Sequence, residues 1–400
     1  MNVKRMIHVL IVDDSAFMRR AIAKMVEKED DIEVVGSAAS GEEGLVLAQS
    51  LKPDVITMDV EMPGMGGLEA ARAIVERHGP PIIMISALTR EGAETTLRAL
   101  EIGAVDFIPK PDSAYIDILK VQRDLVERIR LFGQRTAYLR AVQGQASVGP
   151  PTPSAVLPQS ERPSAPAAAP VAPPRRPPLQ FTPPLPATPI TPLAPRPRTA
   201  TRIGQYECIA LGTSTGGPVA LSHILPKLPK NFPIPIVIVQ HMPPGFTKPL
   251  ADRLNASSQI EVLEGQTGLR LAAGTAVVAP AGQQIRLRRA AGGVEVVLEP
   301  DREKSLHVPS VDSMAHAVGE IFGAAALGVI LTGMGHDGVE GLKTIKARGG
   351  YVVGQDESSS VVYGMPRAAA AAGLVDRVVA LDDIARTLCE LTGTAYHAPA

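Results

Sequence analysis

The chain has 400 residues, more than a single hydrophobic core usually serves, so we expect two globular domains with connecting material between them. Hydrophobic residues make up 45% of the sequence and charged residues 20%, which is enough apolar material for ordinary cores. The 40 basic and 41 acidic residues leave a net charge of -1, which gives no attraction to nucleic acid or to an anionic membrane surface. The bulk composition therefore points away from nucleic-acid-binding and membrane-binding proteins.

The ends of the chain and its cysteines indicate the compartment. An apolar stretch over residues 6–12 runs directly into two aspartates and is too short for a signal peptide. No apolar run reaches the roughly 18 residues that a membrane span needs. Cys208 and Cys389 are far apart and show no metal-type spacing, so neither a disulfide framework nor a zinc site is expected. We expect a cytoplasmic protein without membrane insertion.

The prolines mark the boundary between the domains. Of the 37 prolines, 18 fall between Pro150 and Pro197, mixed with Ala, Ser and Thr. Such a composition cannot bury enough apolar surface to fold, so it predicts a disordered, flexible Pro/Ala-rich linker. The predicted division is an N-terminal domain over residues 1–132, a linker over 133–203 and a C-terminal domain over 204–394.

The first domain alternates short apolar runs with amphipathic segments. Five runs are predicted as strands, with a helix after each, the last helix from about Ala114 to Leu131: His8–Val12, Glu33–Ser37, Val55–Met58, Ile82–Ile85 and Val105–Ile108. Buried strands alternating with helices predict a doubly wound α/β domain with a parallel sheet covered on both faces.

The second domain repeats the strand-then-helix pattern and is also predicted to be α/β with a doubly wound parallel sheet. Its predicted strands are Cys208–Leu211, Pro235–Gln240, Leu327–Leu331 and Tyr351–Val353. Between the second and third of these, residues 261–300 alternate short β-like pieces with glycines, which predicts a small antiparallel insertion at a sheet edge.

Polar residues gather at the predicted strand ends of the first domain, where open α/β sheets carry their chemistry. Asp13 and Asp14 follow the first strand, Asp59 the third, Ser86 the fourth and Lys110 the fifth. Three carboxylates brought together repel one another unless a divalent cation lies between them, and oxygen ligands of this kind suit Mg²⁺. For any one of these residues, capping of the following helix is about as good an explanation. Four strand ends together are not explained by caps.

These residues resemble the response-regulator receiver domain, which has a flavodoxin-like fold. The resemblance covers about residues 6–131. It implies that Asp59 accepts a phosphoryl group, that Asp13 and Asp14 complete a Mg²⁺ site, that Ser86 is the switch hydroxyl and that Lys110 senses the phosphate. It is carried by Asp13-Asp14, the run 58–67 (MDVEMPGMGG), Ser86-Ala87 and Lys110-Pro111.

A glycine-rich turn contains the first candidate catalytic residue of the second domain. The run 212–217 (GTSTGG) follows a predicted strand and precedes a predicted helix, which matches the G-x-S-x-G pattern of serine hydrolases around Ser214. A glycine-rich loop here could instead bind a dinucleotide phosphate. That alternative ranks lower, because the spacing is not G-x-G-x-x-G and no acidic residue ends the next strand.

A nucleophilic serine needs a base and an orienting acid. His241 ends the next predicted strand, and Asp337 lies in the loop after a later strand, so the predicted catalytic set is Ser214, His241 and Asp337. A lone histidine is more often structural, and Asp337 could instead cap the helix that follows it. His336, beside the acid, is a rival base, but it lies inside the loop and not at a strand end.

Five runs of the second domain carry a resemblance to a known family: 212–218, 240–243, 307–312, 331–338 and 355–366. Over about residues 206–391 the domain resembles the chemotaxis protein-glutamate methylesterase family, in a Rossmann-like fold. The family implies hydrolysis of glutamyl methyl esters on methyl-accepting chemotaxis receptors, with methanol released, and often deamidation of receptor glutamines. Its esterase needs no cofactor, and its phosphodonor is a histidine kinase of the chemotaxis type. By the motif of this family, Ser214 is the nucleophile, His241 the base and Asp337 the acid. Thr215 and the Met334 backbone N–H are weaker candidates for oxyanion support.

Three other functions stay open on the sequence alone. The second domain could be a scaffold that only binds partners, or a hydrolase of the same fold that acts on a different ester. A transcriptional output domain is common behind receivers, but the near-neutral charge and the absence of a basic recognition helix argue against it.

Overall fold

The computed structural model describes residues 6–87, 89–110, 118–146, 203–302 and 305–396. The chain divides into two parts, Met1–Ala141 with Thr199–Ala400, and Val142–Arg198. Most of the predicted linker, residues 147–202, lies outside the described residues.

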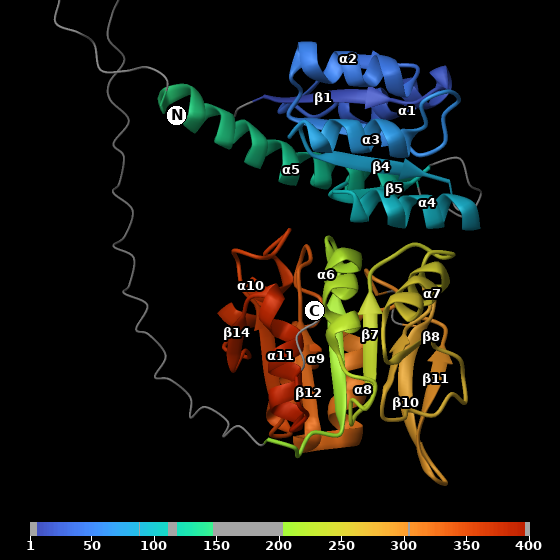
Figure 1. Ribbon diagram of the computed structural model, residues 1–400, viewed down its shortest axis with the longest axis vertical. Helices are drawn as coiled ribbons and strands as arrows, with labels where there is room; N and C mark the ends of the chain where they lie inside the picture. The colour runs from blue at the N-terminus through green and yellow to red at the C-terminus, as the bar shows by residue number, and fades with distance from the viewer. Residues whose placement is uncertain (1–5, 88, 111–117, 147–202, 303–304, 397–400) are drawn as a thin grey trace, which may run out of the picture. The chain divides into compact units, whose positions relative to one another are not determined.

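The first sheet has five strands, all paired in parallel in the order β2-β1-β3-β4-β5. Figure 1 labels β1, β4 and β5 of this sheet. The predicted strand positions agree with the observed ones to within one or two residues at each end. The strands are β1 (Ile7–Val12), β2 (Ile32–Ala38), β3 (Val55–Asp59), β4 (Ile82–Ser86) and β5 (Asp106–Pro109).

Alternate residues of β1 face opposite layers of helices, as the pleat of a strand requires. Val9 and Ile11 pack with α1 and α5, whereas Leu10 and Val12 pack with α2, α3 and α4. Helix α5 continues to Ala146, so its predicted end at Leu131 was wrong, and its predicted start at Ala114 lies outside the described residues. The helices are α1 (Ala16–Val26), α2 (Gly41–Leu51), α3 (Gly67–Glu76), α4 (Arg90–Glu101) and α5 (Ile118–Ala146).

The second sheet has seven strands, paired in parallel in the order β14-β13-β12-β6-β7-β9-β8. The four predicted strands correspond to β6, β7, β12 and β13. The strands are β6 (Cys208–Thr213), β7 (Ile236–Gln240), β8 (Glu261–Glu264), β9 (Thr275–Val278), β12 (Ala326–Ile330), β13 (Tyr351–Gln355) and β14 (Arg377–Val379).

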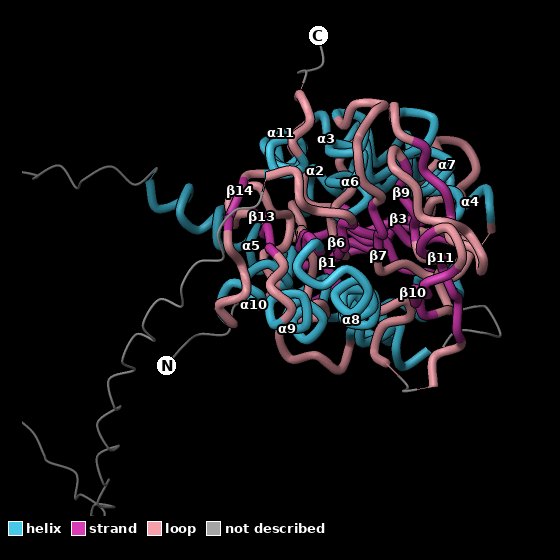
Figure 2. The backbone as a smooth tube through the Cα atoms, turned by 90° about the horizontal axis from the view of Figure 1, so that it is seen from below, coloured by secondary structure: helices cyan, strands magenta, loops and turns pink. Residues whose placement is uncertain are grey.

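Helices cover both faces of this sheet (Figure 2). Ile209 and Leu211 of β6 pack with α6, α7 and α11 on one face, whereas Cys208 and Ala210 pack with α8, α9 and α10 on the other. The helical segments are α6 (Gly217–Ile224), η1 (Leu225–Lys227), α7 (Thr247–Ser257), α8 (Val311–Phe322), η2 (Gly323–Ala325), α9 (Val339–Ala347), α10 (Met365–Ala371) and α11 (Leu381–Thr392). The doubly wound parallel fold predicted for both domains is confirmed.

The antiparallel insertion is smaller than predicted. Among the described strands, β10 (Gln284–Ala290) and β11 (Gly293–Glu299) form the antiparallel pair, and an isolated antiparallel bridge joins Arg270 to Glu295. The earlier part of residues 261–300 gives β8 and β9, which join the edge of the main sheet in parallel. The glycines between the short strands indicated the turns correctly, but a turn-rich sequence does not determine the direction in which two strands pair.

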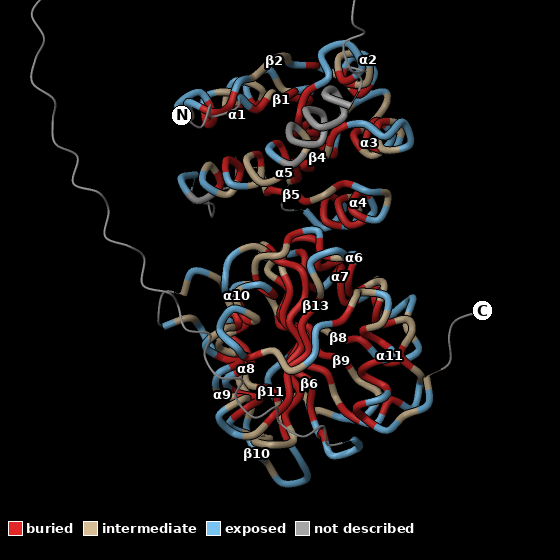
Figure 3. The backbone as a smooth tube through the Cα atoms, turned by 90° about the vertical axis from the view of Figure 1, so that its left-hand side faces the viewer, coloured by how far each residue is buried: buried red, intermediate tan, exposed pale blue. Residues whose placement is uncertain are grey.

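The strand order determines which loops meet. Strand β6 lies between β12 and β7. Because these strands are parallel, the loops that follow all three lie together at the carboxyl end of the sheet. The strands themselves are buried (Figure 3), and the polar residues follow where they end. Within the described residues, no helix has both the length and the apolar character needed to cross a membrane.

The packing of α9 on the second sheet gives a stability prediction. Leu342 is 1% exposed and sits over Gly328 of β12, where an added Cβ would lie 2.6 Å from Leu342 Cδ2. Leu342→Ala is expected to lower the free energy of unfolding by about 2–5 kcal/mol, because it leaves a cavity over this glycine. Urea denaturation of the full chain, followed by circular dichroism, measures the change. The control Val378→Ala alters a side chain that is 54% exposed, and an equal effect of the two variants would contradict the packing argument.

Candidate active site

The loop between β6 and α6 holds Ser214 in a fixed turn. The Ser214 N–H donates to the carbonyl of Thr332 at 3.0 Å, and the Ser214 carbonyl accepts from the Gly217 N–H at 2.8 Å. Gly216 has φ +78°, and a Cβ at that position would lie 2.7 Å from Val361 Cβ. Ser214 itself is not among the described residues with positive φ, so the backbone strain of a nucleophile elbow is not present at the serine.

His241 follows β7, the strand beside β6. Its N–H donates to the carbonyl of Thr213 at 3.2 Å, which ties the start of its loop to the end of the serine strand. Its ring Nε2 lies 2.7 Å from Oδ2 of Asp337, and its Nδ1 is buried and has no hydrogen-bond partner among the described residues. The side chains of His241 and Asp337 are only 8% and 10% exposed.

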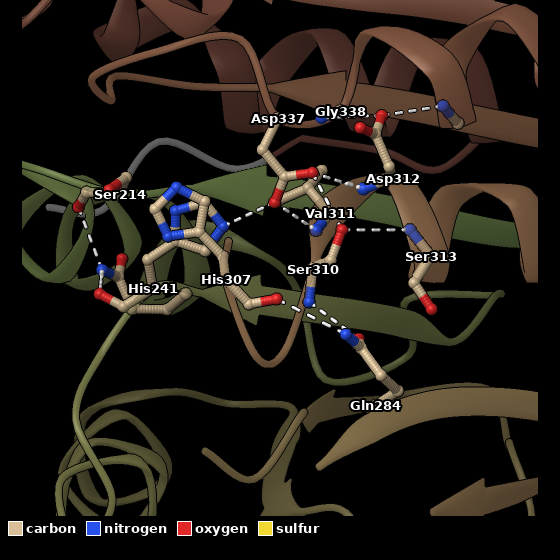
Figure 4. A network of polar contacts seen from close by, with 12 residues as sticks. Ser214, His241, Gln284, His307, Ser310, Val311, Asp312, Ser313, Asp337 and Gly338 are labelled. Atoms are coloured by element: carbon tan, nitrogen blue, oxygen red, sulfur yellow. Dashed lines mark hydrogen bonds and ion pairs between the residues drawn. The ribbon is translucent and has the colours of Figure 1, made fainter. Parts of the chain in front are cut away.

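The Asp337 carboxylate lies at the N-terminus of α8 (Figure 4). It accepts hydrogen bonds from Ser310 Oγ at 2.9 Å, from the Val311 N–H at 2.8 Å and from the Asp312 N–H at 2.9 Å, in addition to His241. Burial alone would raise the pKa of Asp337, but the hydrogen bond and charge of His241 and the two backbone N–H donors outweigh it and hold the pKa well below its usual range.

An ionised Asp337 determines which nitrogen of His241 carries the proton. A carboxylate only accepts hydrogen bonds, so Nε2 donates, and in the neutral imidazole Nδ1 is then the acceptor. The nitrogen available to a serine proton is therefore Nδ1. In the protease template the two nitrogens have the opposite assignment.

Helices α8 and α9 exchange capping carboxylates. Asp312, in the first turn of α8, accepts from the N–H groups of Gly338 and Gly341, each at 2.9 Å. Asp337 caps α8 in return, so it does not cap the helix that follows it. Burial raises the pKa of Asp312, and the nearby charge of Asp337 raises it further.

The structure brings Ser214 to the same end of the sheet as His241 and Asp337, but in the described residues no hydrogen bond joins the serine hydroxyl to Nδ1 of the imidazole. In Figure 4 the imidazole of His241 lies between Ser214 and Asp337. Since Nδ1 has no partner among the described residues, the hydroxyl is not yet bonded to it. Such links are often open without substrate. The rival base His336 is exposed, and its carbonyl accepts from the Val339 N–H at 3.2 Å.

The tentative oxyanion residues flank the serine. A Cβ on Gly333 would lie 2.9 Å from Ser214 Cβ, so the backbone that leads into Met334 runs directly against the serine. The Thr215 carbonyl accepts from Thr332 Oγ1 at 2.9 Å, which links the serine loop to the loop after β12. Oxyanion support by Thr215 and Met334 stays a prediction.

A second polar site lies at the strand ends of the first sheet. One carboxylate oxygen each of Asp13, Asp14 and Asp59 lies within 4.8 Å of the others. Lys110 Nζ donates to Asp59 Oδ2 at 2.8 Å, and Ser86 Oγ donates to the carbonyl of Ala87 at 3.2 Å, so the predicted switch hydroxyl is turned to its own backbone.

The acidic pocket has the chemistry of a hard-cation site. Asp13 and Asp59 are fully buried, and Asp13 Oδ2 has no hydrogen-bond partner among the described residues. Burial, and then the charge of Asp59, raise the pKa of Asp13 to about 6, and burial also raises the pKa of Asp59. An orphaned buried oxygen among crowded carboxylates fits a Mg²⁺ ligand set. Ser15, not Asp14, caps α1, by accepting from the Met18 N–H.

Comparisons with known proteins agree with both halves of this description. Residues 209–388 match the CheB methylesterase family, and residues 9–118 match the response regulator receiver domain. The chain is 43% identical over 387 residues to the protein-glutamate methylesterase/protein-glutamine glutaminase 1 of Oleidesulfovibrio alaskensis, with 96% of this chain and 98% of that protein covered. The chain belongs to the CheB methylesterase family.

The chain is similar to further proteins as well. The protein-glutamate methylesterase/protein-glutamine glutaminase of Bacillus subtilis is 41% identical over 385 residues, with 96% of this chain and 98% of that protein covered. Among solved structures, the CheB methylesterase catalytic domain of Thermotoga maritima is 40% identical, with 46% of this chain and 98% of that chain covered and a TM-score of 0.46. The response regulator domain of Thermotoga maritima CheB is 46% identical, with 32% and 98% covered and a TM-score of 0.30.

Several residues that shape this CheB-family site had no role in the sequence analysis. Gln240 is 2% exposed, and its Nε2 donates to the carbonyls of Ser214 at 3.0 Å and His241 at 2.9 Å, so it joins the loop of Ser214 to the loop of His241. Ser310 holds Asp337, and the ring of His307 stacks on His241. Gln240 and His307 belong to runs that carry the family resemblance, but their positions in the sequence gave no reason to assign them a role.

The acidic pocket gives a pH prediction. Metal binding needs ionised carboxylates, and the raised pKa of Asp13, about 6, means that this group gains a proton as the pH falls below 6. The dissociation constant for Mg²⁺, measured by isothermal titration calorimetry on the full chain, is expected to rise by roughly tenfold for each pH unit below 6. Asp13→Asn should bind Mg²⁺ more weakly at pH 8 and show a flatter dependence between pH 8 and pH 5. An unchanged wild-type dissociation constant from pH 7 to pH 5 would contradict the assignment of Asp13 as a ligand.

Proposed function

We propose that this chain is a phosphorylation-regulated protein-glutamate methylesterase that hydrolyses glutamyl methyl esters on methyl-accepting chemotaxis receptors and deamidates receptor glutamines. The observation that carries the proposal is the bond of 2.7 Å between His241 Nε2 and Asp337 Oδ2, which leaves Nδ1 as the basic nitrogen beside the strand of Ser214. Full-length relatives named for both activities support the same substrate class.

In the proposed acylation, Ser214 Oγ attacks the carbonyl carbon of the methyl ester while Nδ1 of His241 takes the hydroxyl proton. Asp337 holds the ring and stabilises the imidazolium, because it stays ionised. The tetrahedral intermediate collapses when His241 returns the proton to the methoxide oxygen, so methanol leaves and a glutamyl ester of Ser214 remains. Backbone N–H groups near Ser214 and Met334 are the candidates to bind the oxyanion.

In the proposed deacylation, a water molecule gives one proton to His241 Nδ1 and attacks the same carbonyl carbon. Release of Ser214 takes that proton back and leaves the receptor glutamate. A glutamine side chain follows the same route, with ammonia in place of methanol. None of these steps needs a cofactor.

The first domain supports the regulatory half of the proposal. Asp59 is buried, lies beside Asp13 and Asp14 and is paired with Lys110, which is the arrangement that a phosphoacceptor and its charge-neutralising lysine need. These three aspartates would hold Mg²⁺, which would neutralise charge during phosphoryl transfer from a histidine kinase of the chemotaxis type.

We infer further that the unphosphorylated receiver inhibits the hydrolase and that phosphorylation of Asp59 relieves this inhibition. Phosphorylation can shift the receiver only by the difference in stability that the phosphoryl group confers on its two states, so part of the activity should remain without it.

The serine mechanism predicts a near-complete loss of activity in one variant. Ser214→Ala in the full chain should lower kcat for methanol release from methylated receptor fragments by about 10⁴- to 10⁶-fold, since the variant lacks the hydroxyl that His241 would deprotonate. Phosphorylation of Asp59 by a small phosphodonor should be unchanged. Ser257→Ala, at an exposed position on α7, is the matched control and should leave kcat unaltered. A Ser214→Ala protein that still released methanol at the wild-type rate would remove the serine mechanism. A serine-reactive phosphonate that labelled the wild type but not Ser214→Ala would argue against a binding-only scaffold.

The inhibition hypothesis predicts a second set of rates. A phosphodonor should raise methanol release by the full chain about 5- to 150-fold, the range of ordinary coupling free energies. Asp59→Asn should abolish the stimulation, whereas Asp30→Asn, at an exposed loop position, should retain it. A fragment of residues 200–400 should be active without any phosphodonor. If this fragment were slower than the unphosphorylated full chain, inhibition by the receiver would be wrong.

A further inference from the structure

A second imidazole covers the ring of His241. The ring of His307 lies parallel to it, with centroids 3.9 Å apart and an interplanar angle of 10°. Figure 4 shows the two rings overlapping, with the bond from His241 to Asp337 leaving at their edge. His307 comes from the segment between β11 and α8, far in sequence from β7.

This segment is held by the groups that also hold the acid. Gln284 of β10 is 3% exposed, and its Oε1 accepts from the Ser310 N–H at 2.9 Å while its Nε2 donates to the carbonyl of His307 at 3.4 Å. Ser310 Oγ in turn donates to Asp337. The stacking ring and the orienting carboxylate are therefore positioned by one short segment.

His307 also forms part of the wall of a cavity. This cavity has a volume of about 970 Å³, and His307, His316 and Asp337 are among its lining residues, whereas His241 is not. His307 therefore contacts both the ring of His241 and the cavity.

The His241 ring needs such a contact for a geometric reason. Its Nδ1 has no hydrogen-bond partner among the described residues, so Asp337 supplies the one hydrogen bond recorded for the ring. A single bond at Nε2 fixes the position of that atom but leaves the plane of the ring free to tilt about it. A parallel ring at van der Waals distance removes this freedom.

We propose that His307 is a positioning residue for the hydrolysis, whose ring holds the plane of His241 so that Nδ1 stays directed toward Ser214. This inference rests on the proposed function. The contribution comes from the flat face of the His307 ring and not from a proton that it carries.

The test replaces the ring in two ways in the full chain. His307→Leu keeps much of the side-chain volume but not the flat face. For this variant, kcat for methyl ester hydrolysis is expected to fall on the order of 10- to 100-fold with KM unchanged, because displacement of a catalytic group by about 1 Å costs this much. His307→Phe keeps a flat face and has no exchangeable proton, and it is expected to retain most of kcat. His316→Leu, at an exposed position on α8 in the same cavity, is the matched control and should behave as the wild type.

Three outcomes would overturn the proposal. In the first, His307→Leu has the wild-type kcat. In the second, His307→Phe is as slow as His307→Leu while His307→Gln is fast, which would show that hydrogen bonding and not stacking matters. In the third, KM rises in His307→Leu with kcat unchanged, which would show a substrate contact.

Two further measurements keep the result interpretable. Thermal unfolding by circular dichroism compares the stability of each variant, and His307→Met, also without a flat ring, replaces His307→Leu if that protein does not fold. Ser214→Ala is assayed beside them. Full activity in Ser214→Ala would remove the proposed function, whereas an inactive Ser214→Ala with a normal His307→Leu would remove only this inference.

Discussion

The carboxylate of Asp337 at the N-terminus of α8 is the constraint on which the second site depends. Four donors converge on it, three from the start of α8 and one from His241. A helix N-terminus favours negative charge, so this placement keeps the group ionised although it is nearly buried. Its ionisation determines the tautomer of His241, and the tautomer determines which ring nitrogen can accept a proton.

The two sites use the same architectural position with opposite electrostatics. Both lie where parallel strands end, which is where open α/β sheets place their chemistry. In the first sheet, carboxylates crowd together, and burial and mutual repulsion raise the pKa of Asp13. In the second, donors surround a single carboxylate, and the pKa of Asp337 is lowered. The first arrangement favours binding of a cation, whereas the second favours a permanently charged partner for an imidazole.

Much of the fold and the outline of both sites could be predicted from the sequence, because strand ends and apolar runs are local features. Ser214, His241 and Asp59 were predicted as site residues from their places after predicted strands, and the structure places each of them after an observed strand or at its last residue. The short edge strand β14 was not predicted, since it has three residues and two of them are exposed. The parallel pairing of β8 and β9 was missed because strand direction depends on the path of the chain between them. The exchange of caps between Asp312 and Asp337, and the stacking of His307, bring together residues 25 or more positions apart, which no local pattern encodes.

The orientation of the His241 ring has a consequence for how firmly the site is built. Nδ1 is bonded to Cγ, close to the main chain, whereas Nε2 lies at the far end of the ring. With Asp337 bonded to the far end, the atom that would receive the serine proton has a short lever arm to the backbone. A swing of the side chain about χ1 therefore displaces Nδ1 less than Nε2. A turn of the ring about the Cβ–Cγ bond does displace Nδ1, and the bond to Asp337 together with the parallel ring of His307 opposes that turn.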